Sequence, residues 1–168
     1  MDIHINKISS ASEVETVAAL AKTIWNEYYK SLLGQAQVDY MLGKYQTQKA
    51  INAQIKDGDY DYFLILADER PVGYFGIIEK HNEVFLSKLY ILGSERGKRI
   101  GRIAINFLMA RCREIKAEYI TLTVNKHNLD SISAYEKMGF EIYGELVSDI
   151  GSGYVMDDFQ MRLRINPR

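Results

Sequence analysis

The sequence contains a single cysteine, Cys112, and only two prolines among its 168 residues. One cysteine excludes a disulfide within the chain and any metal site built from several cysteines. The three histidines, His4, His81 and His127, lie far apart without ligand spacing, so no metal site is expected. Because prolines are few and no glycine- or serine-rich linker occurs, residues 1–168 are predicted to form one domain.

Long apolar runs and an excess of positive charge are missing too. No segment approaches the ~18 consecutive apolar residues needed to cross a membrane. The segment Met1–Lys7 lacks the basic and then apolar pattern of a secretory signal peptide. The formal net charge of -1 argues against non-specific binding to nucleic acid, which requires a basic surface. These absences predict a cytoplasmic protein whose partners are neither membranes nor nucleic acids.

Helical periodicity is present in the N-terminal third of the chain. Ser10 and Glu13 form an S-x-x-E capping box. The apolar residues behind it recur at helical spacing and predict a long amphipathic helix: Val14, Val17, Ala21, Ile24 and Tyr28. Residues 35–56 are predicted to be helical in two pieces broken near Gly43, and the turn at 57–59 ends the second piece.

The rest of the chain alternates strand-like and helical segments. Strands are predicted at 2–7, 62–67, 72–78, 84–91, 119–124, 140–147 and 154–163, with a turn at 68–71. One helix is predicted after residue 99. Its apolar residues are predicted to share one face: Ile100, Ile103, Ala104, Phe107 and Ala110. A short helix at 128–138 ends at Gly139. This order predicts an α/β fold, with a mixed sheet and helices on both of its faces.

The segment Arg96–Arg102 lies between a predicted strand and a predicted helix and carries four basic side chains within seven residues. The first turn of a helix has unpaired N–H groups and partial positive charge, and glycine lets a ligand approach the backbone. The segment therefore suits a diphosphate. A solvated, basic helix start with turn glycines explains the same pattern. The spacing matches neither G-x-x-x-x-G-K-[ST] nor G-x-G-x-x-G.

Two motifs give the sequence a resemblance that covers most of the chain. Arg96 and Gly101 match the ends of [QR]-x-x-G-x-[GA], and a second set matches N-x-x-(A/S)-x-x-x-Y-x-x-x-G-F: Asn128, Ser131, Tyr135, Gly139 and Phe140. With the intervening strand, this order resembles the GNAT superfamily of N-acetyltransferases. The resemblance implies a single-domain, mostly antiparallel GNAT-like sheet and acetyl-coenzyme A as acetyl donor. Arg99 departs from the pattern, because it occupies the first glycine position of the loop motif.

The resemblance also implies roles for particular residues. Those expected to bind the cofactor are Leu89, Tyr90, Ile91, Arg96, Gly97, Lys98, Arg99, Ile100, Gly101, Arg102, Asn128, Ser131 and Tyr135. A backbone N–H near Leu89 would polarise the thioester carbonyl. Tyr135 is the predicted catalytic residue, a general acid that protonates the departing thiolate. Purely structural explanations stand beside these roles: Leu89 and Ile91 as core residues, Asn128 as a helix N-cap, and Tyr135 as a packing side chain.

The acceptor site is predicted from aromatic and acidic residues. The residues proposed to bind substrate are Trp25, Tyr29, Tyr40, Asp157 and Asp158, with Tyr28, Tyr45 and Tyr154 nearby. Ring faces and carboxylates of this kind bind cations. No general base is identified, since the predicted strand 84–91 contains no carboxylate. Ser87 or Tyr90 could order a water instead, and Glu79, Asp157 and Asp158 are more distant candidates.

Three functions remain open at this stage. The first is acetylation of a small primary amine, because the tail and the W-N-E-Y-Y segment are similar to a bacterial subgroup described as diamine or polyamine acetyltransferases. The second is acetylation of a protein N-terminus or lysine. The third is a non-catalytic coenzyme A-binding sensor or interaction module. The resemblance leaves a homodimer open as well.

Overall fold

A computed structural model describes residues 1–165, and positions 166–168 lie outside the described residues. The contacts divide the chain into two compact units. The first contains residues 1–78 and 88–104, and the second contains residues 79–87 and those from 105 onward. Each unit is described below by itself. Within residues 1–165, no helix is long and apolar enough to cross a membrane.

The first unit begins with β1 (Ile3–Lys7) and α1 (Ala11–Leu33). The predicted capping box is present, since Ser10 Oγ accepts the Glu13 N–H at 3.2 Å and Glu13 Oε1 accepts the Ser10 N–H at 3.0 Å. The amphipathic helix is confirmed, and its buried face consists of Val14, Val17, Leu20, Ala21, Ile24 and Trp25.

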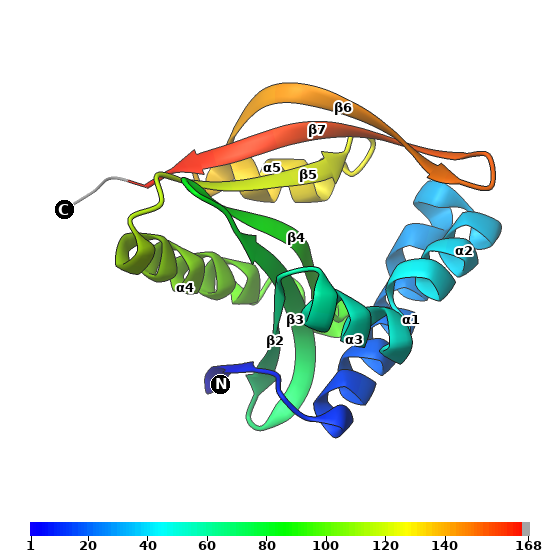
Figure 1. The fold of residues 1–168 in the computed structure, drawn as a ribbon, viewed down its shortest axis with the longest axis horizontal. Helices are drawn as coiled ribbons and strands as arrows, with labels where there is room; N and C mark the ends of the chain where they lie inside the picture. Colours follow the sequence, from blue (N-terminus) through cyan, green and yellow to red (C-terminus); the bar gives the residue numbers. More distant parts are fainter. Residues whose placement is uncertain (166–168) are drawn as a thin grey trace. The chain divides into compact units, whose positions relative to one another are not determined.

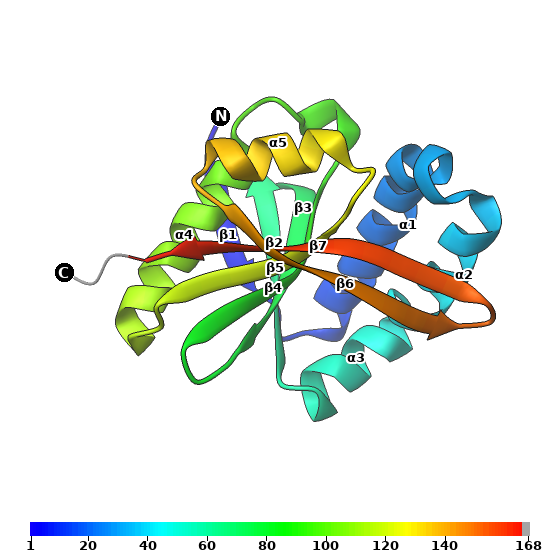
Figure 2. The ribbon, with the colours of Figure 1, turned by 90° about the horizontal axis from the view of Figure 1, so that it is seen from above.

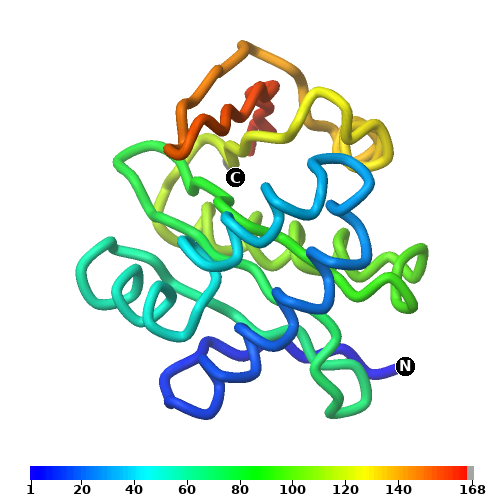
Figure 3. Tube along the Cα trace, turned by 90° about the vertical axis from the view of Figure 1, so that its right-hand side faces the viewer, coloured from blue at the N-terminus to red at the C-terminus, as the bar shows by residue number. Residues whose placement is uncertain are grey.

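The break between the next two helices differs from the prediction. Helix α2 (Gln35–Tyr45) runs through Gly43, and α3 (Gln48–Asp57) begins after Thr47. Figure 3 shows α3 as a separate coil in the cyan part of the trace. The Thr47 side chain caps α3 by accepting the Ala50 N–H at 3.1 Å. An interior glycine costs a helix only about 1 kcal/mol relative to alanine, whereas threonine is a favourable N-cap residue. The prediction of a break near Gly43 was therefore wrong, while the ending at Gly58 is confirmed.

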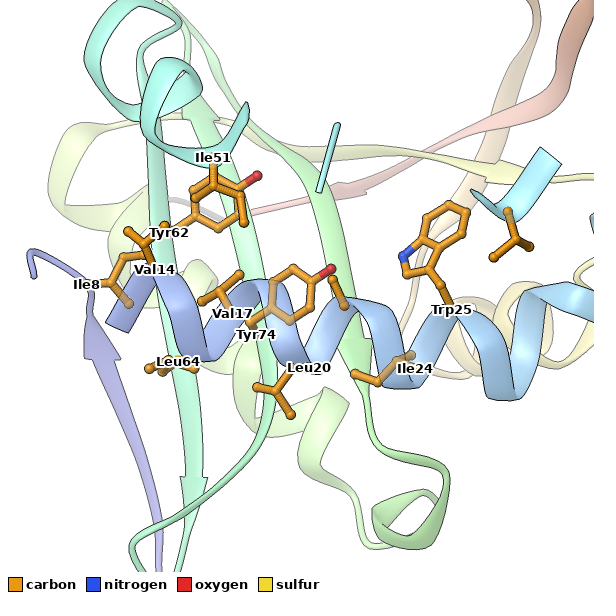
Figure 4. Close-up of a cluster of buried hydrophobic side chains, with 12 residues drawn as sticks. Ile8, Val14, Val17, Leu20, Ile24, Trp25, Ile51, Tyr62, Leu64 and Tyr74 are labelled. Atoms are coloured by element: carbon orange, nitrogen blue, oxygen red, sulfur yellow. The ribbon is translucent and has the colours of Figure 1, made fainter. Parts of the chain in front are cut away.

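Strands β2 (Tyr60–Ala67) and β3 (Arg70–Glu79) pair antiparallel, and β1 pairs antiparallel with β2. Asp68 and Glu69 join β2 to β3 with φ of 47° and 65°, as in a two-residue hairpin loop. The turn is thus shorter than the predicted 68–71. The core of this unit lies between α1, α3 and these strands (Figure 4), and it includes Ile8, Val14, Val17, Leu20, Ile24, Ile51, Tyr62, Leu64 and Tyr74.

The second unit contains β5 (Tyr119–Asn125), α5 (Leu129–Lys137), β6 (Glu141–Gly151) and β7 (Tyr154–Arg164). Strand β5 pairs antiparallel with β7, and β7 with β6 in a long hairpin (Figure 2). Residues 105–115 of α4 (Ile100–Ile115) also belong to this unit. The predicted stripe on α4 needs correction. Ile103 and Phe107 are 36% and 37% exposed, and the buried positions are Ile100, Ala104, Ile105, Leu108 and Cys112.

Strand β4 (Glu83–Ile91) contributes residues 83–87 to the second unit and residues 88–91 to the first. It pairs parallel with β5, from Glu83 opposite Tyr119 to Leu86 opposite Leu122. The strand order is β1-β2-β3-β4-β5-β7-β6 (Figure 1). The predicted α/β fold with a mixed, mostly antiparallel sheet is confirmed.

Candidate active site

The predicted diphosphate loop follows β4 directly. A short 3₁₀ turn, η1 (Gly93–Glu95), leads into residues 96–99, and α4 begins at Ile100. The Arg99 carbonyl accepts the Ile103 N–H at 3.2 Å, so Arg99 is the N-cap residue of α4. The N–H groups of Ile100 and Gly101 therefore belong to the first helical turn, where no carbonyl of the helix can accept them. The loop thus presents the positive end of a helix to an anion.

Arg99 adopts the backbone conformation that the family glycine would provide. Its φ is 64°, and that of Gly97 is 78°. Left-handed backbone costs a residue with a side chain about 1–2 kcal/mol. The loop therefore keeps the shape expected for the glycine motif, at a cost in strain.

Arg99→Gly is expected to stabilise the protein, because glycine adopts this φ without steric cost. Glycine's greater freedom in the unfolded chain offsets up to about 1 kcal/mol of the gain. The net increase in melting temperature should be about 2 °C, measured by calorimetry. Gly97→Ala, which adds strain at the second positive φ, should lower it. An Arg99→Gly protein that melts below the wild type would contradict this account.

Two of the basic side chains in the loop have intramolecular partners. The Arg96 guanidinium lies 3.9 Å from the centre of the Tyr28 ring, and its Nε donates to the Ile91 carbonyl at 3.4 Å. Lys98 Nζ donates to Glu95 Oε2 at 2.8 Å. The Lys98 hydrogen bond lowers the pKa of the buried Glu95 carboxyl. Arg96 and Lys98 thus tie the loop to α1, β4 and η1.

The aromatic residues predicted to bind substrate separate into two groups. Trp25 and Tyr29 stack with ring centroids 4.5 Å apart, and Tyr90 of β4 lies 5.4 Å from Trp25 and 5.8 Å from Tyr29. Trp25 is only 3% exposed and belongs to the hydrophobic core. Tyr40 is not among these contacts: on α2, its hydroxyl accepts a hydrogen bond from Lys44 at 3.3 Å. Tyr29 and Tyr40 are both half-buried, whereas Trp25 is enclosed.

Lys88 of β4 is a buried ionisable residue that the sequence analysis did not single out. It is 8% exposed, its Nζ lies 2.7 Å from Gln54 Oε1, and it contacts the Tyr62 hydroxyl. Burial lowers the pKa of Lys88 to about 7 and raises that of Tyr62. A neutral amine can accept from the Tyr62 hydroxyl while donating to Gln54. The signal in the sequence was a lone lysine inside an apolar strand.

Lys88→Met is expected to remove a pH dependence of stability. The pKa of Lys88 is lowered from 10.5 to about 7 in the folded protein, so the unfolded chain binds more protons between these values. The free energy of unfolding of the wild type should rise with pH in this window, by up to about 1.4 kcal/mol per unit. Urea unfolding at pH 7, 8 and 9 should show a gain for Lys88→Met that shrinks as pH rises. Exposed Lys56→Met is the control, and a gain independent of pH would contradict the shift.

In the second unit, the residues of the second motif lie at the start of α5, within it and directly after it. Asn128 is the N-cap and accepts the Ser131 N–H at 3.3 Å. Tyr135 is half-buried, and its ring meets Phe140 edge-on at 5.3 Å. Burial raises the pKa of Tyr135 to about 12. The phenol is therefore protonated at neutral pH and able to donate.

The candidate carboxylates differ in their partners. Arg111 donates to both Glu79 oxygens, with NH2 3.2 Å from Oε2, which leaves Glu79 poorly suited to be a base. Lys126 Nζ lies 2.8 Å from Asp157 Oδ1. Asp158 is 8% exposed, and its Oδ1 has no hydrogen-bond partner among residues 1–165. Burial raises the pKa of Asp158 to about 6.

Comparison with known proteins agrees with this geometry. The acetyltransferase (GNAT) family matches residues 21–140. The chain is 31% identical over 67 residues to the uncharacterized N-acetyltransferase YdgE of Bacillus subtilis (strain 168), a match covering 40% of this chain and 43% of YdgE. It is 29% identical over 87 residues to the peptidyl-lysine N-acetyltransferase YjaB of Salmonella typhimurium, covering 51% of this chain and 54% of YjaB. The chain thus spans about half the length of these curated relatives.

A solved structure extends the similarity over nearly the whole chain. The PaiA N-acetyltransferase of Thermoplasma acidophilum, crystallised with coenzyme A, superposes with a TM-score of 0.82 at 20% identity. The match covers 98% of this chain and 99% of the other. Because the family match spans more than half of the sequence, the chain belongs to the acetyltransferase (GNAT) family.

Proposed function

We propose that this chain is an N-acetyltransferase that moves acetyl directly from acetyl-coenzyme A to the primary amine of a small cationic substrate, such as a polyamine. The observation that carries the proposal is the loop before α4. It combines left-handed backbone at Gly97 and Arg99 with the exposed first turn of a helix, within the region that matches the family.

The loop and β4 are suited to hold acetyl-coenzyme A. The N–H groups of Ile100 and Gly101 would bind the diphosphate, with exposed Arg99 and Arg102 adding positive charge at the same turn. The backbone of Leu89–Ile91 would pair with the pantetheine arm, and all three of these residues are half-buried rather than enclosed. Asn128 and Ser131 of the second unit are also proposed to bind the cofactor. When bound, acetyl-coenzyme A supplies a thioester carbonyl with a thiolate leaving group.

Tyr135 is proposed to deliver the proton that the departing sulfur requires. Its raised pKa, about 12, keeps the phenol protonated across the pH range in which a small amine is partly neutral. Among residues 1–165, the structure gives the Tyr135 hydroxyl no hydrogen-bond partner, so the donor is available to a ligand. The backbone N–H near Leu89 is proposed to polarise the carbonyl.

A cationic acceptor is supported by the ring of Tyr29 and by acidic groups on β7. Asp157 is exposed and already paired with Lys126, whereas Asp158 is buried and has no cation in contact within residues 1–165. An aromatic face and a carboxylate are each favourable partners for an ammonium group. Trp25 is proposed to support Tyr29 from the core. Tyr40 is proposed to cover the far end of a longer substrate.

A peptidyl lysine is the second candidate acceptor. The relative YjaB is named as a peptidyl-lysine N-acetyltransferase. A lysine side chain ends in the same alkyl ammonium as a polyamine, so the chemistry of the acceptor nitrogen does not separate them. The two acceptors differ instead in the size of the molecule that carries the nitrogen.

An amine panel with acetyl-coenzyme A, monitored by thiol release, tests the proposal. Spermidine and short diamines are expected to release thiol well above background. Preference for lysine peptides would favour the second candidate. Binding of acetyl-coenzyme A by calorimetry without thiol release from any amine would show that the chain is a coenzyme sensor and not an enzyme.

A further inference from the structure

Asp158 is a buried carboxylate that the protein leaves uncompensated. It is 8% exposed, and its Oδ1 has no hydrogen-bond partner within the described part of the chain. Buried polar groups in folded proteins are nearly always paired, because desolvation without a partner is costly. An orphaned carboxylate oxygen therefore suggests a partner that arrives as a ligand.

Asp157 and Asp158 lie on opposite faces of β7, and of the two only Asp158 is buried. Successive residues of a strand point to opposite faces, so Asp157 and Asp158 must separate. Phe159 pairs with Val124, and Met161 with Leu122, which marks one face of β5 and β7 as apolar. Asp158 pairs with Asn125, and Gln160 with Thr123, on the polar face.

Among the described residues of this unit, no cation contacts Asp158. Lys126 is the nearby basic group, and it contacts Asp157 at 2.8 Å and Glu145 at 3.4 Å. The residues opposite Asp158 are Asn125 on β5 and Leu146 on β6, which carry no charge. Asn125 already uses its Oδ1 to accept the His127 N–H at 2.9 Å. The strand partners of Asp158 therefore supply no positive charge to its buried carboxylate. Arg162 lies further along the same face, but it is exposed and its guanidinium stacks on the rings of Tyr119 and Tyr143.

We propose that the Asp158 carboxylate binds the ammonium of the acceptor amine and takes its proton, an inference that rests on the proposed function. In this step an N–H bond of the ammonium breaks, its electron pair stays on nitrogen, and an O–H bond forms on the carboxylate. The neutral amine is then the nucleophile, and the Asp158 proton leaves to water after acetyl transfer. Asp158 is thereby the general base, which the sequence analysis named only among its more distant candidates.

The titration of Asp158 suits this role. Burial and then the Asp157 charge raise its pKa to about 6, while Lys126 opposes them. A base must be ionised to accept a proton, so Asp158 is competent above pH 6 and loses this capacity as pH falls below it. A pKa near 6 also returns the proton to water readily at neutral pH.

The test compares Asp158→Asn with Glu145→Gln, which removes an exposed carboxylate from the neighbouring Lys126 group. For Asp158→Asn, kcat/KM for spermidine should fall at least about 100-fold. The Kd for spermidine, measured by calorimetry on protein saturated with coenzyme A, should rise more than about tenfold. The wild-type decline in kcat/KM below pH 6 should disappear. Glu145→Gln should match the wild type, and both variants should keep their affinity for coenzyme A.

Spermidine binding and thiol release separate the two hypotheses. If the wild type binds spermidine through Asp158 but no amine releases thiol, the proposed acetyltransferase activity is wrong, while the proposed cation site is supported. If Asp158→Asn binds and acetylates spermidine as well as the wild type does, or if the wild type does not bind spermidine, the Asp158 proposal is overturned. A loss of coenzyme A affinity in Asp158→Asn equal to its loss of activity would also overturn it, because the effect would then be structural.

Discussion

Tyr135→Phe is expected to lower kcat about 100-fold while leaving the Kd for acetyl-coenzyme A within about threefold of the wild type. The substitution removes only the phenolic oxygen and keeps the ring that packs against Phe140 at 5.3 Å. A general acid contributes in the transition state, so its loss appears in kcat rather than in cofactor binding. Steady-state kinetics with thiol detection and calorimetry of cofactor binding measure the two quantities.

The pH dependence of the Tyr135→Phe effect is a second check. Because burial raises the pKa of Tyr135 to about 12, the phenol stays protonated between pH 6 and pH 10. The ratio of wild-type to variant kcat should therefore be constant over this range. Tyr143→Phe on β6 is the matched control, since Tyr143 is 44% exposed and belongs to neither motif. A Tyr135→Phe enzyme that keeps a third of the wild-type kcat would show that Tyr135 is a packing residue.

Local chemistry explains which parts of the fold the sequence predicted. The capping box at Ser10 and Glu13, and the N-cap at Asn128, act within a few residues of chain and are confirmed as predicted. The break between α2 and α3 was predicted near Gly43, because glycine is a poor helix former. The break instead lies next to Thr47, which caps α3. Glycine weakens a helix, but threonine can start a new one by capping it.

Long-range packing explains the errors on α4. Ile103 and Phe107 fit a helical stripe as well as Ile105 and Leu108 do, since both sets recur at helical spacing. Only the position of the sheet decides which stripe is buried, and a single helix does not encode that position. Periodicity therefore predicted the helix but not its face.

The same distinction applies to the candidate site. The motif marked Arg99 as a glycine position, and its φ of 64° lies in the region that glycine adopts freely. The burial of Lys88 and Asp158 did not follow, since both depend on residues that are distant in the sequence. The sequence analysis proposed both Asp157 and Asp158 for the substrate site, whereas neighbouring residues of a strand face opposite ways and only Asp158 is buried.

Gly101→Asp is expected to abolish tight binding of acetyl-coenzyme A without unfolding the protein. Gly101 is in the first turn of α4, and a Cβ added there would meet only Ile91 Cδ1, at 3.7 Å, an ordinary contact. An aspartate near a helix N-terminus also stabilises the helix by about 0.3–1 kcal/mol. Its charge would nevertheless oppose the diphosphate at the place where the loop is proposed to bind it.

The size of that effect follows from Coulomb's law. Two like charges about 4 Å apart near a protein surface repel by roughly 4 kcal/mol. Salt screens part of this repulsion, and the remainder should raise the Kd at least about 100-fold. Calorimetry with coenzyme A measures the change, and high salt should partly restore binding. Gly101→Ala has the added carbon without the charge and should raise Kd only a few-fold. Because α4 gains a favourable first-turn charge, Gly101→Asp should melt no lower than the wild type. A variant that binds coenzyme A normally would show that the diphosphate lies elsewhere, since a fixed negative charge at this turn is incompatible with the proposed position.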